Sequence, residues 1–559
     1  MVDSLDDEHE QSVVHGSLSA ARELDARLVV VAGGPIDSPH QRLRASNFAF
    51  DLMGPDNTLG ILCLSSALGN AVGPERLGSW LSRYRGVPVC CMGVSIAGYE
   101  SVRVDNAAGI SAAVEHLVKE HGKRNIGFIR GPAQSDEAEL RYAAYKNKLL
   151  DHGINPDPRW VAEGDYNRPS GSQAVRQILD QRRVSVHALD ALVCANDYMA
   201  LGAMDELGRR GINVPEQIAV FGFDDVASAA ESRPALSTVH QPGSELGREG
   251  LKRLMLLVGG GQNGSGEHVL PVELKIRRSC GCVGTEVGLA QRVQGGSSSA
   301  RFEAALIQRR QVIVAELARS AQGSFGAGGS DWESALLSAL IEEMRDGKQG
   351  ALSRRVQRLL LKLEQAGGDF SVVSQVLATL RRQALPCVAL NDEARDRLED
   401  ALADAQQIAT TMLVQAAVAS TRVAMMRSRT LARVVEQAMF EGPAAVSRAL
   451  GEHLPGLGVE ACVVAAVLPG EQGFLGRVRF GFGPGKGHPE QEALPLTRLP
   501  EHPLVEASRT LFLLPLVLGE EPLGVAAFSV TSQLAKSELL EDLRELLSIV
   551  LKVMQTTHA

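Results

Sequence analysis

Aromatic side chains are scarce in this sequence. Phe, Trp and Tyr make up only 4% of its 559 residues, whereas 45% of the residues are hydrophobic. Any core must therefore consist mostly of aliphatic side chains. The formal net charge of −9 argues against a dispersed surface for polyanions, although a local basic patch is compatible with it. At about 150 residues per domain, the length predicts three or four domains.

Cysteine is also sparse. Eight cysteines, unevenly placed in 559 residues, do not form the framework of a disulfide-rich protein. Neither Cys90-Cys91 nor Cys280-Gly281-Cys282 has the C-x₂-C spacing typical of zinc sites. We interpret them as ordinary buried or half-exposed thiols, with a redox role for Cys-Gly-Cys as the alternative. The sequence thus predicts no metal site and no cofactor.

Segments for export or membrane insertion are missing as well. The N-terminus, MVDSLDDEHEQ, is acidic and lacks the basic and apolar regions of a signal peptide. The longest uncharged stretch of the C-terminal half, residues 405–421, contains three Gln, three Thr and one Ser in AQQIATTMLVQAAVAST. It is too short and too polar to span a bilayer. The prediction is a cytoplasmic protein without a membrane segment.

Two stretches resemble catalytic motifs but lack residues that those motifs require. GAGGSDWE at 326–333 has the wrong residue order for a GGDEF signature, and Gly487 in GFGPGKGH replaces the hydroxyl residue of a phosphate loop. No histidine lies in the pattern of a kinase dimerisation helix, and the leucine-rich run 353–383 is better explained as bundle core than as helix-turn-helix. We therefore expect no enzyme, and no motif supports direct DNA binding.

Residues 1–282 alternate short apolar runs with amphipathic stretches such as 109–119 and 199–209. Uninterrupted apolar strands separated by helices predict α/β structure, with parallel sheets covered on both faces. About 280 residues would accommodate two such sheets. The runs are 28–31, 60–64, 87–90, 126–129, 191–194 and 218–221.

The alternation of strands and helices ends at two turn-rich stretches, VGGGQNGSG (258–266) and GGSSS (295–299). Helices are predicted first, at 301–320, 331–345 and 353–366, and then in a run at 392–440 without Gly or Pro. Strands and a hairpin follow from 459 to 530. Leu539, Leu543, Leu546, Val550 and Val553 then form a heptad seam that predicts a dimerising helix. The predicted parts are 1–282 (α/β), 283–300 (linker), 301–440 (helical bundle), 443–535 (small α+β domain) and 536–559 (coiled-coil-like helix).

Two strands end in pairs of polar residues, Asn196-Asp197 and Asp224-Asp225. Ligands of open α/β sheets bind outside the carboxyl ends of strands, which is where these side chains would lie. The alternative is helix N-capping, which we weigh about equally for Asp197. Asp105 is interpreted as a cap and Asp225 as structural.

The stretches VRVDNAAGISAAVEHLVKEHGKRNIGFIRGP (102–132), EAELRYAAYKNKLLDHGI (137–154), ALVCANDYMALGAMDELGRRGINVPEQIAVFGFDD (191–225) and PALSTVHQP (234–242) resemble the effector-binding core of the LacI/GalR family. The resemblance covers most of residues 1–282. It implies two Rossmann-like lobes of the periplasmic-binding-protein-like type I fold, joined by a three-strand hinge. It also implies a small ligand, most often a sugar or nucleobase, in the cleft.

The resemblance assigns roles by position. Arg141 matches the arginine that reaches into the cleft and bonds ligand hydroxyls or carboxylate, which its forked donors suit. Asn196 and Asp197 match the polar pair at the cleft floor, and Asp224 and Gln241 match two further contact positions. We expect Arg141 to face a solvent-filled cleft.

The sequence departs from the family at both ends. LacI-type repressors begin with a helix-turn-helix, which does not precede this core, and only Met1-Val2 remains for the central first strand. We therefore expect the first strand to be truncated. LKIRRSCGC (274–282) resembles sensors placed ahead of signalling modules, and LFLLPLVLGEEPLGVAAFSV (511–530) is similar to the closing hairpin of GAF domains.

The predicted function is a cytoplasmic ligand-sensing regulator. It would bind a sugar-like or nucleobase-like effector, form a homodimer, and pass its state to a downstream signalling protein or to transcription. One alternative is a solute-binding protein for transport. Another is a LacI-type regulator whose DNA-binding head is missing from this chain.

Overall fold

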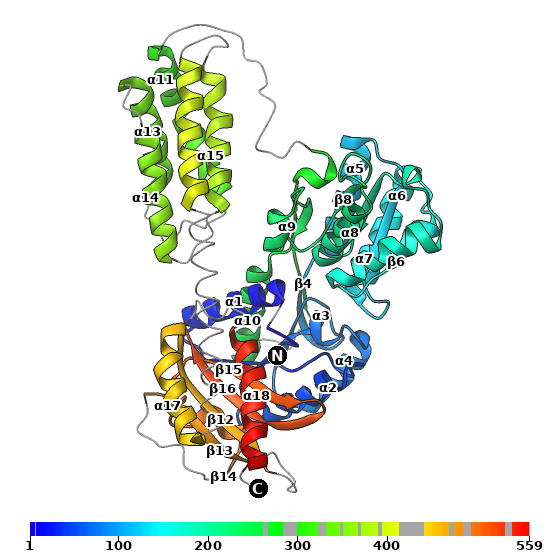
Figure 1. Cartoon of the computed structure of the whole chain (residues 1–559), viewed down its shortest axis with the longest axis vertical. Coiled ribbons are helices and arrows are strands. Elements are labelled where there is room, and N and C mark those ends of the chain that lie inside the picture. The colour runs from blue at the N-terminus through cyan, green and yellow to red at the C-terminus, as the bar shows by residue number, and fades with distance from the viewer. Residues whose placement is uncertain are drawn as a thin grey trace. The chain divides into compact units, whose positions relative to one another are not determined.

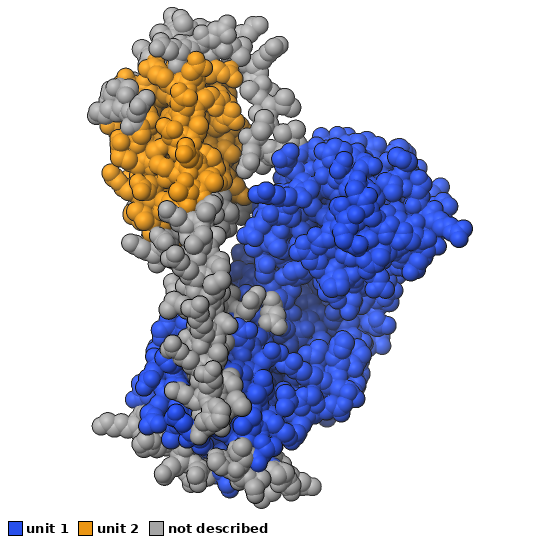
Figure 2. Space-filling model, in the orientation of Figure 1, with its two compact units in different colours: residues 1–282, 427–559 blue, residues 283–426 orange. Residues whose placement is uncertain are grey.

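The computed structural model divides the chain into two compact units, residues 1–282 with 427–559, and residues 283–426 (Figure 2). Each is described below by itself. The helical unit takes its structure from amphipathic segments, and the larger unit from alternating strands and helices. The structure describes residues 1–5, 7–260, 266–282, 299–321, 331–346, 350–366, 371–388, 394–412, 441–468, 475–484, 493–531 and 539–557.

The first lobe of the larger unit contains a parallel four-stranded sheet in the order β10-β4-β3-β2. The apolar runs at 60–64 and 87–90 supply β2 and β3, as predicted. Helices α1 and α10 pack against each other, and α10 covers β2, β3 and β4. The elements are α1 (Glu8–Glu23), α2 (Gln41–Ser46), η1 (Asn47–Leu52), β2 (Ile61–Leu64), α3 (Ser65–Leu68), α4 (Gly73–Leu81), η2 (Ser82–Tyr84), β3 (Val89–Met92), β4 (Glu100–Val104), α10 (Gly243–Val258) and β10 (Glu267–Leu270).

The second lobe repeats this plan with the parallel order β6-β5-β7-β8 (Figure 1). Its core is mostly aliphatic, as the low aromatic content requires, and its largest fully buried side chains are Tyr145, Phe128, Phe221 and Phe223. The elements are α5 (Asn106–His121), β5 (Ile126–Arg130), α6 (Asp136–Asp151), η3 (Pro158–Trp160), β6 (Val161–Glu163), α7 (Arg168–Arg176), η4 (Gln177–Gln181), η5 (Val186–Ala188), β7 (Ala191–Cys194), α8 (Asp197–Arg209), β8 (Ala219–Phe221), α9 (Ala227–Glu231), β9 (Thr238–His240), β11 (Glu273–Lys275) and η6 (Arg278–Cys280).

The C-terminal strands form a sheet that includes a strand of the first lobe. Its order is β1-β15-β16-β12-β13-β14, in which β1 (Leu28–Val31) pairs parallel with β15 and the other neighbours are antiparallel. The sequence predicts these strands as a separate domain, whereas in the structure they continue the sheet of the larger unit. The further elements are α17 (Pro443–His453), η9 (Pro455–Leu457), β12 (Val459–Val467), β13 (Leu475–Phe482), β14 (Ala493–Pro495), η10 (Leu496–Glu501), β15 (Thr510–Leu518), β16 (Glu521–Val530) and α18 (Leu539–Thr557).

Both faces of this C-terminal sheet are buried, because its strands are apolar at successive positions. Along β15, Phe512 and Leu514 belong to the core shared with α17 and α18. The intervening Leu511 and Leu513 pack in a second core with residues such as Phe50 from η1. The alternation is the period of a strand, so one element joins two cores.

Helix α18 corrects the prediction of a dimerising seam. Leu539, Leu543 and Val550 are at most 1% exposed and lie in the core with the sheet residues. The helix contacts β15 and β16 of its own chain (Figure 1). A 3.5-residue apolar repeat marks a helix with one buried stripe, and here a sheet covers that stripe.

Met1 and Val2 lie between β1 and β2, at the position expected for the first strand. The backbone N–H of Val2 donates to Val31 O at 3.0 Å, and Leu64 N–H donates to Met1 O at 3.1 Å. A cavity of about 560 Å³ adjoins them, and residues of β1, β2 and α10 line it. The geometry fits the predicted position of the strand, and its truncation stays a prediction.

The helical unit contains the predicted helices, with one difference. The expected helix at 301–320 is split at Arg309 into two helices. Residues 394–412 are helical, and the rest of the predicted 392–440 helix lies outside the described residues. No described helix of the chain combines the length and hydropathy needed to cross a membrane. The helices are α11 (Ser299–Gln308), α12 (Arg310–Ser320), α13 (Trp332–Asp346), α14 (Ala351–Ala366) and α15 (Ser371–Ala384), followed by η8 (Leu385–Cys387).

Candidate functional site

Three chain crossings connect the two lobes. The chain passes from β4 to α5, from β9 to α10, and from β10 to β11, as a three-strand hinge requires. The antiparallel pairing of β9 with β11 places two of the crossings side by side. The carboxyl ends of β7 and β8 lie in the same lobe as α6, which carries Arg141. The hinge and these strand ends define the candidate site.

Arg141 is the centre of the polar cluster in the second lobe. Its Nε donates to Asn106 Oδ1 at 2.7 Å, and its Nη1 donates to Ala195 O at 2.5 Å. The guanidinium lies 3.8 Å from the ring centroid of Phe223, a stacking geometry that suits arginine. The residue is only 2% exposed. The expectation of a solvent-facing Arg141 is therefore wrong in this conformation, because its donors are engaged inside the lobe.

Asn196 is the N-cap of α8. Its Oδ1 accepts from Met199 N–H at 2.9 Å, and its Nδ2 donates to Tyr166 O at 3.0 Å. Capping was an alternative role for Asp197, but in the structure Asn196 takes that role. Asn196 is 5% exposed, so it shapes the floor of the site with its polar atoms already paired.

Asp197 is fully buried at the first position of α8. Its Oδ2 accepts from the N–H groups of Asp225 and Val226 at 2.8 and 3.1 Å, and its Oδ1 accepts from Thr238 Oγ1 at 2.6 Å. Burial raises the pKa of Asp197 to about 7, although these hydrogen bonds work in the opposite direction. The carboxyl group therefore ties β7, β9 and the loop after β8 together.

Stability is expected to fall between about pH 4 and pH 7 because of this residue. Folding raises the pKa of Asp197 from 3.8 to about 7, so its contribution is fully present below the unfolded value and disappears as pH passes the folded value. The loss amounts to at most about 4 kcal/mol, at 1.4 kcal/mol for each pH unit. Asp197→Asn should flatten a urea-unfolding profile over this range. Asp224, whose pKa burial also raises, leaves a residual slope. An unchanged slope in the variant would contradict the assignment.

Asp224 and Gln241 face each other beside Arg141. Gln241 Nε2 donates to Asp224 Oδ1 at 2.5 Å, and the same carboxylate oxygen lies 3.9 Å from Arg141 Nη1. Asp224 has a φ of 119°, a value that L-residues rarely adopt and that aims its side chain at the cluster. The structure thus brings together the predicted contact residues Arg141, Asp224 and Gln241.

The two residues interpreted as structural behave that way. Asp105 Oδ1 accepts from Ala108 N–H at 2.9 Å and caps α5. Asp225 bonds His240 Nδ1 at 3.0 Å and Arg277 Nη2 at 2.6 Å. Burial tends to raise the pKa of Asp225, but the hydrogen bond with His240 and the charge of Arg277 together lower it.

Sequence reasoning missed several side chains of the cluster. Asn106 and Phe223 contact Arg141 directly, and Glu137 Oε1 lies 3.9 Å from Arg141 Nη2. Burial lowers the pKa of His9 in the first lobe, and the nearby positive charge of Arg141 also acts to lower it. Asn106 directly follows Asp105, and Phe223 directly precedes Asp224. Because both neighbours were candidates at strand ends, their positions in the sequence could have indicated that Asn106 and Phe223 lie at the site.

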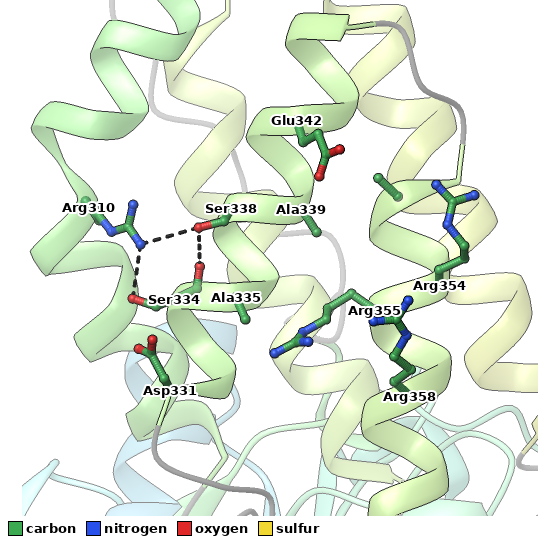
Figure 3. A pocket seen from close by; sticks show the side chains of 11 residues that line it. Arg310, Asp331, Ser334, Ala335, Ser338, Ala339, Glu342, Arg354, Arg355 and Arg358 are labelled. Atoms are coloured by element: carbon green, nitrogen blue, oxygen red, sulfur yellow. Dashed lines mark hydrogen bonds between the residues drawn. The ribbon is translucent and has the colours of Figure 1, made fainter.

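A second polar feature belongs to the helical unit (Figure 3). It is a groove of about 570 Å³ between α12, α13 and α14. Arg310 Nη2 lies 3.3 Å from both Ser334 Oγ and Ser338 Oγ. Glu342 and Arg354 also have interaction partners of their own. The groove is thus a surface lined by residues of both charges, including Asp331, Glu342, Arg354 and Arg358.

The larger unit is therefore a two-lobed α/β binding protein with a hinge of three crossings and a polar cluster at its strand ends. Comparison with known proteins agrees with this class. The periplasmic binding protein-like domain family matches residues 114–280. The HTH-type transcriptional repressor CytR of Escherichia coli K12 is 32% identical over 246 residues, which are 44% of this chain and 68% of CytR. The HTH-type transcriptional repressor PurR of Salmonella paratyphi B is 36% identical over 185 residues, or 33% of this chain and 53% of PurR.

The chain belongs to the LacI/GalR family. Its relatives are transcriptional repressors and not enzymes, so this is a ligand-sensing regulatory protein rather than a catalyst. Solved structures of lower likeness include the Lac repressor dimer bound to operator, at 26% identity and a TM-score of 0.42, covering 50% of this chain and 91% of that one. A LacI family transcriptional regulator from Mycobacterium smegmatis has 25% identity and a TM-score of 0.43, covering 50% and 96%. At these TM-scores neither structure adds to the assignment.

Proposed function

We propose that residues 1–282 bind a small polyhydroxylated or nucleobase-like effector at the cluster of Arg141, Asp224 and Gln241. The observation that carries the proposal is the pair Arg141 Nη1 and Asp224 Oδ1, which lie 3.9 Å apart. This separation is too long for a hydrogen bond but short enough for one hydroxyl to bridge the two groups. Such a hydroxyl would accept from the guanidinium and donate to the carboxylate. Asn196 and Asp197 hold the floor of the site in shape.

The two lobes touch next to this cluster. Glu8 Oε2, at the start of α1, accepts from Ala227 N–H at the start of α9, at 2.6 Å. A carboxylate at a helix N-terminus is a favourable contact, and this one joins the first lobe to the second. Effector binding would shift the balance between lobe arrangements in proportion to its differential affinity for them.

The C-terminal sheet is the proposed receiver of this signal. Because β15 pairs with β1 over four residues, from Leu28 with Thr510 to Val31 with Leu513, the sheet is attached to the first lobe. We propose that residues 443–535 act as a GAF-like module and that the protein works as a cytoplasmic homodimer. It would pass the effector state to a partner protein or to transcription.

A thermal-shift screen against sugars, nucleosides and purine bases tests the effector site. A ligand at 100 times its Kd adds about 2.7 kcal/mol, which should raise the midpoint by about 3 °C for a unit of this size. Gln241→Ala should remove the shift, because it deletes the amide that orients Asp224. Arg168→Ala is the matched control, since Arg168 lies on α7 of the same lobe with an exposed side chain. A hit that shifts Gln241→Ala as much as the parent would place the effector elsewhere.

A further inference from the structure

Four side chains with metal-binding atoms converge at the far end of α5. His116 and His121 come from the last turns of this helix, and Cys280 and Cys282 come from the segment that ends the second lobe. One donor atom from each residue lies within 4.8 Å of the other three. The two pairs are separated by more than 150 residues in the sequence, so only the fold brings them together.

Four of the six distances between these atoms fit the edges of one coordination tetrahedron. His116 Nε2 lies 3.3 Å from His121 Nε2 and 3.5 Å from each of Cys280 Sγ and Cys282 Sγ. Cys282 Sγ lies 3.3 Å from His121 Nε2. A Zn²⁺ ion with bonds of about 2.05 Å to nitrogen and 2.3 Å to sulfur separates its ligands by about 3.3 Å for N···N and about 3.5 Å for N···S.

Hydrogen bonding alone accounts poorly for this arrangement. His116 Nε2 has three neighbours at 3.3 to 3.5 Å, namely His121 Nε2 and the two sulfur atoms. A ring nitrogen carries either one proton or one lone pair, so it can make only one strong hydrogen bond. A cation at the centre would satisfy all four atoms at once.

We propose that His116, His121, Cys280 and Cys282 bind one Zn²⁺ ion in a structural site. Two imidazoles and two thiolates in a tetrahedron are a ligand set that selects zinc. Four protein donors close the coordination sphere, and closed spheres characterise structural rather than catalytic zinc. Donors that all lie within 4.8 Å of one another surround a single ion rather than a two-iron cluster.

The backbone is shaped to present these donors. Gly281 has a φ of 106°, which allows the chain to turn back so that both cysteines face the same point. A Cβ at this position would lie 3.2 Å from His121 Nδ1, so the close approach of the imidazole also favours glycine. On the helix side, Gly122 has a φ of 62° and ends α5 directly after His121.

The site would anchor the segment through which the chain leaves the second lobe. Ser279 Oγ donates to Val220 O at 2.6 Å and accepts from Ser237 N–H at 2.8 Å, and Arg277 binds Asp225 next to the effector cluster. Zinc would fix the end of this segment to α5, whose other end carries Asn106 against Arg141. The metal would then hold the exit of the chain in a constant relation to the effector site.

Metal analysis of the full chain, purified under reducing conditions, tests this proposal. We expect about one zinc per chain by mass spectrometry. After replacement by Co²⁺, we expect the absorption of a tetrahedral site with thiolate-to-cobalt charge transfer. Chelation should lower the thermal midpoint by about 5 °C or more. Cys282→Ser and His121→Asn should each weaken zinc at least about 100-fold in competition with an indicator dye.

Two substitutions outside the cluster are matched controls. Cys387→Ser removes a half-buried thiol of the helical unit, and His187→Asn removes an exposed imidazole of the same lobe. Both should retain the metal with unchanged affinity. The measurement on the unsubstituted chain needs no variant to fold, so it decides the matter alone. A chain with eight titratable thiols that takes up no zinc and shows no thiolate–cobalt band would overturn the site.

Discussion

Arg141→Ala is expected to destabilise the larger unit as well as to abolish effector binding. The substitution leaves Asn106 Oδ1 and Ala195 O without their donor and removes the stacking on Phe223. It also strips the compensating cation from Asp224, whose Oδ1 lies 3.9 Å from the guanidinium. Breaking such a buried set by removing one partner costs about 3 to 5 kcal/mol. Urea unfolding should show the loss, and the thermal shift by the effector should disappear.

The control for this prediction is the exposed arginine of the same lobe. Arg168 pairs with Asp205, and the two side chains are 52% and 49% exposed. Arg168→Ala should change stability by less than about 1 kcal/mol, as expected for a surface pair. If Arg141→Ala unfolds at the same urea concentration as the parent, the buried position of its guanidinium does not describe the protein in solution.

Leu547→Ala is expected to have a similarly large effect, through packing alone. Leu547 is fully buried on α18, in the core that contains Leu514 of β15 and Phe528 of β16. Shortening a buried leucine costs about 2 to 5 kcal/mol through lost transfer energy and the cavity left behind. The midpoint of thermal unfolding should fall accordingly.

Ile549 on the same helix provides the comparison. Its side chain is 47% exposed, so Ile549→Ala should change stability by no more than about 0.5 kcal/mol. A Leu547→Ala chain that unfolds at the same temperature as the parent would contradict the packing of α18 against the sheet of its own chain. Removing α18 altogether should expose the apolar face of β15 and β16 and cause aggregation.

Local patterns predicted the strands and the larger helices well. Runs such as 191–194 and 126–129 became β7 and β5, because a continuous apolar run flanked by helices suits a strand buried on both faces. Asp105 caps α5 as expected, since its position before the helix leaves little else for it to bond. The predicted runs omit the strands β4, β6, β9, β10 and β11, because charged or polar residues within these short strands interrupt the apolar run.

Arg141, Asp224 and Gln241 lie together, as the family resemblance implied, and their role as ligand contacts stays a prediction. The sequence could not show that Asn196 caps α8 while Asp197 turns towards Thr238, because adjacent polar residues have the same local options. Which of them takes the cap depends on where the loop after β8 supplies N–H donors.

The sequence by itself determined the alternation of strands and helices, the two lobes and their family, because these depend on periodicity and on motifs of neighbouring residues. The tertiary structure alone decided three features. It covered the heptad seam of α18 with a sheet, it buried Arg141, and it placed His116 and His121 beside Cys280 and Cys282. Each depends on contacts between residues far apart in the chain. A spacing rule such as C-x₂-C detects only ligands that are close in the sequence. The ligands of a metal site need only be close in the folded structure.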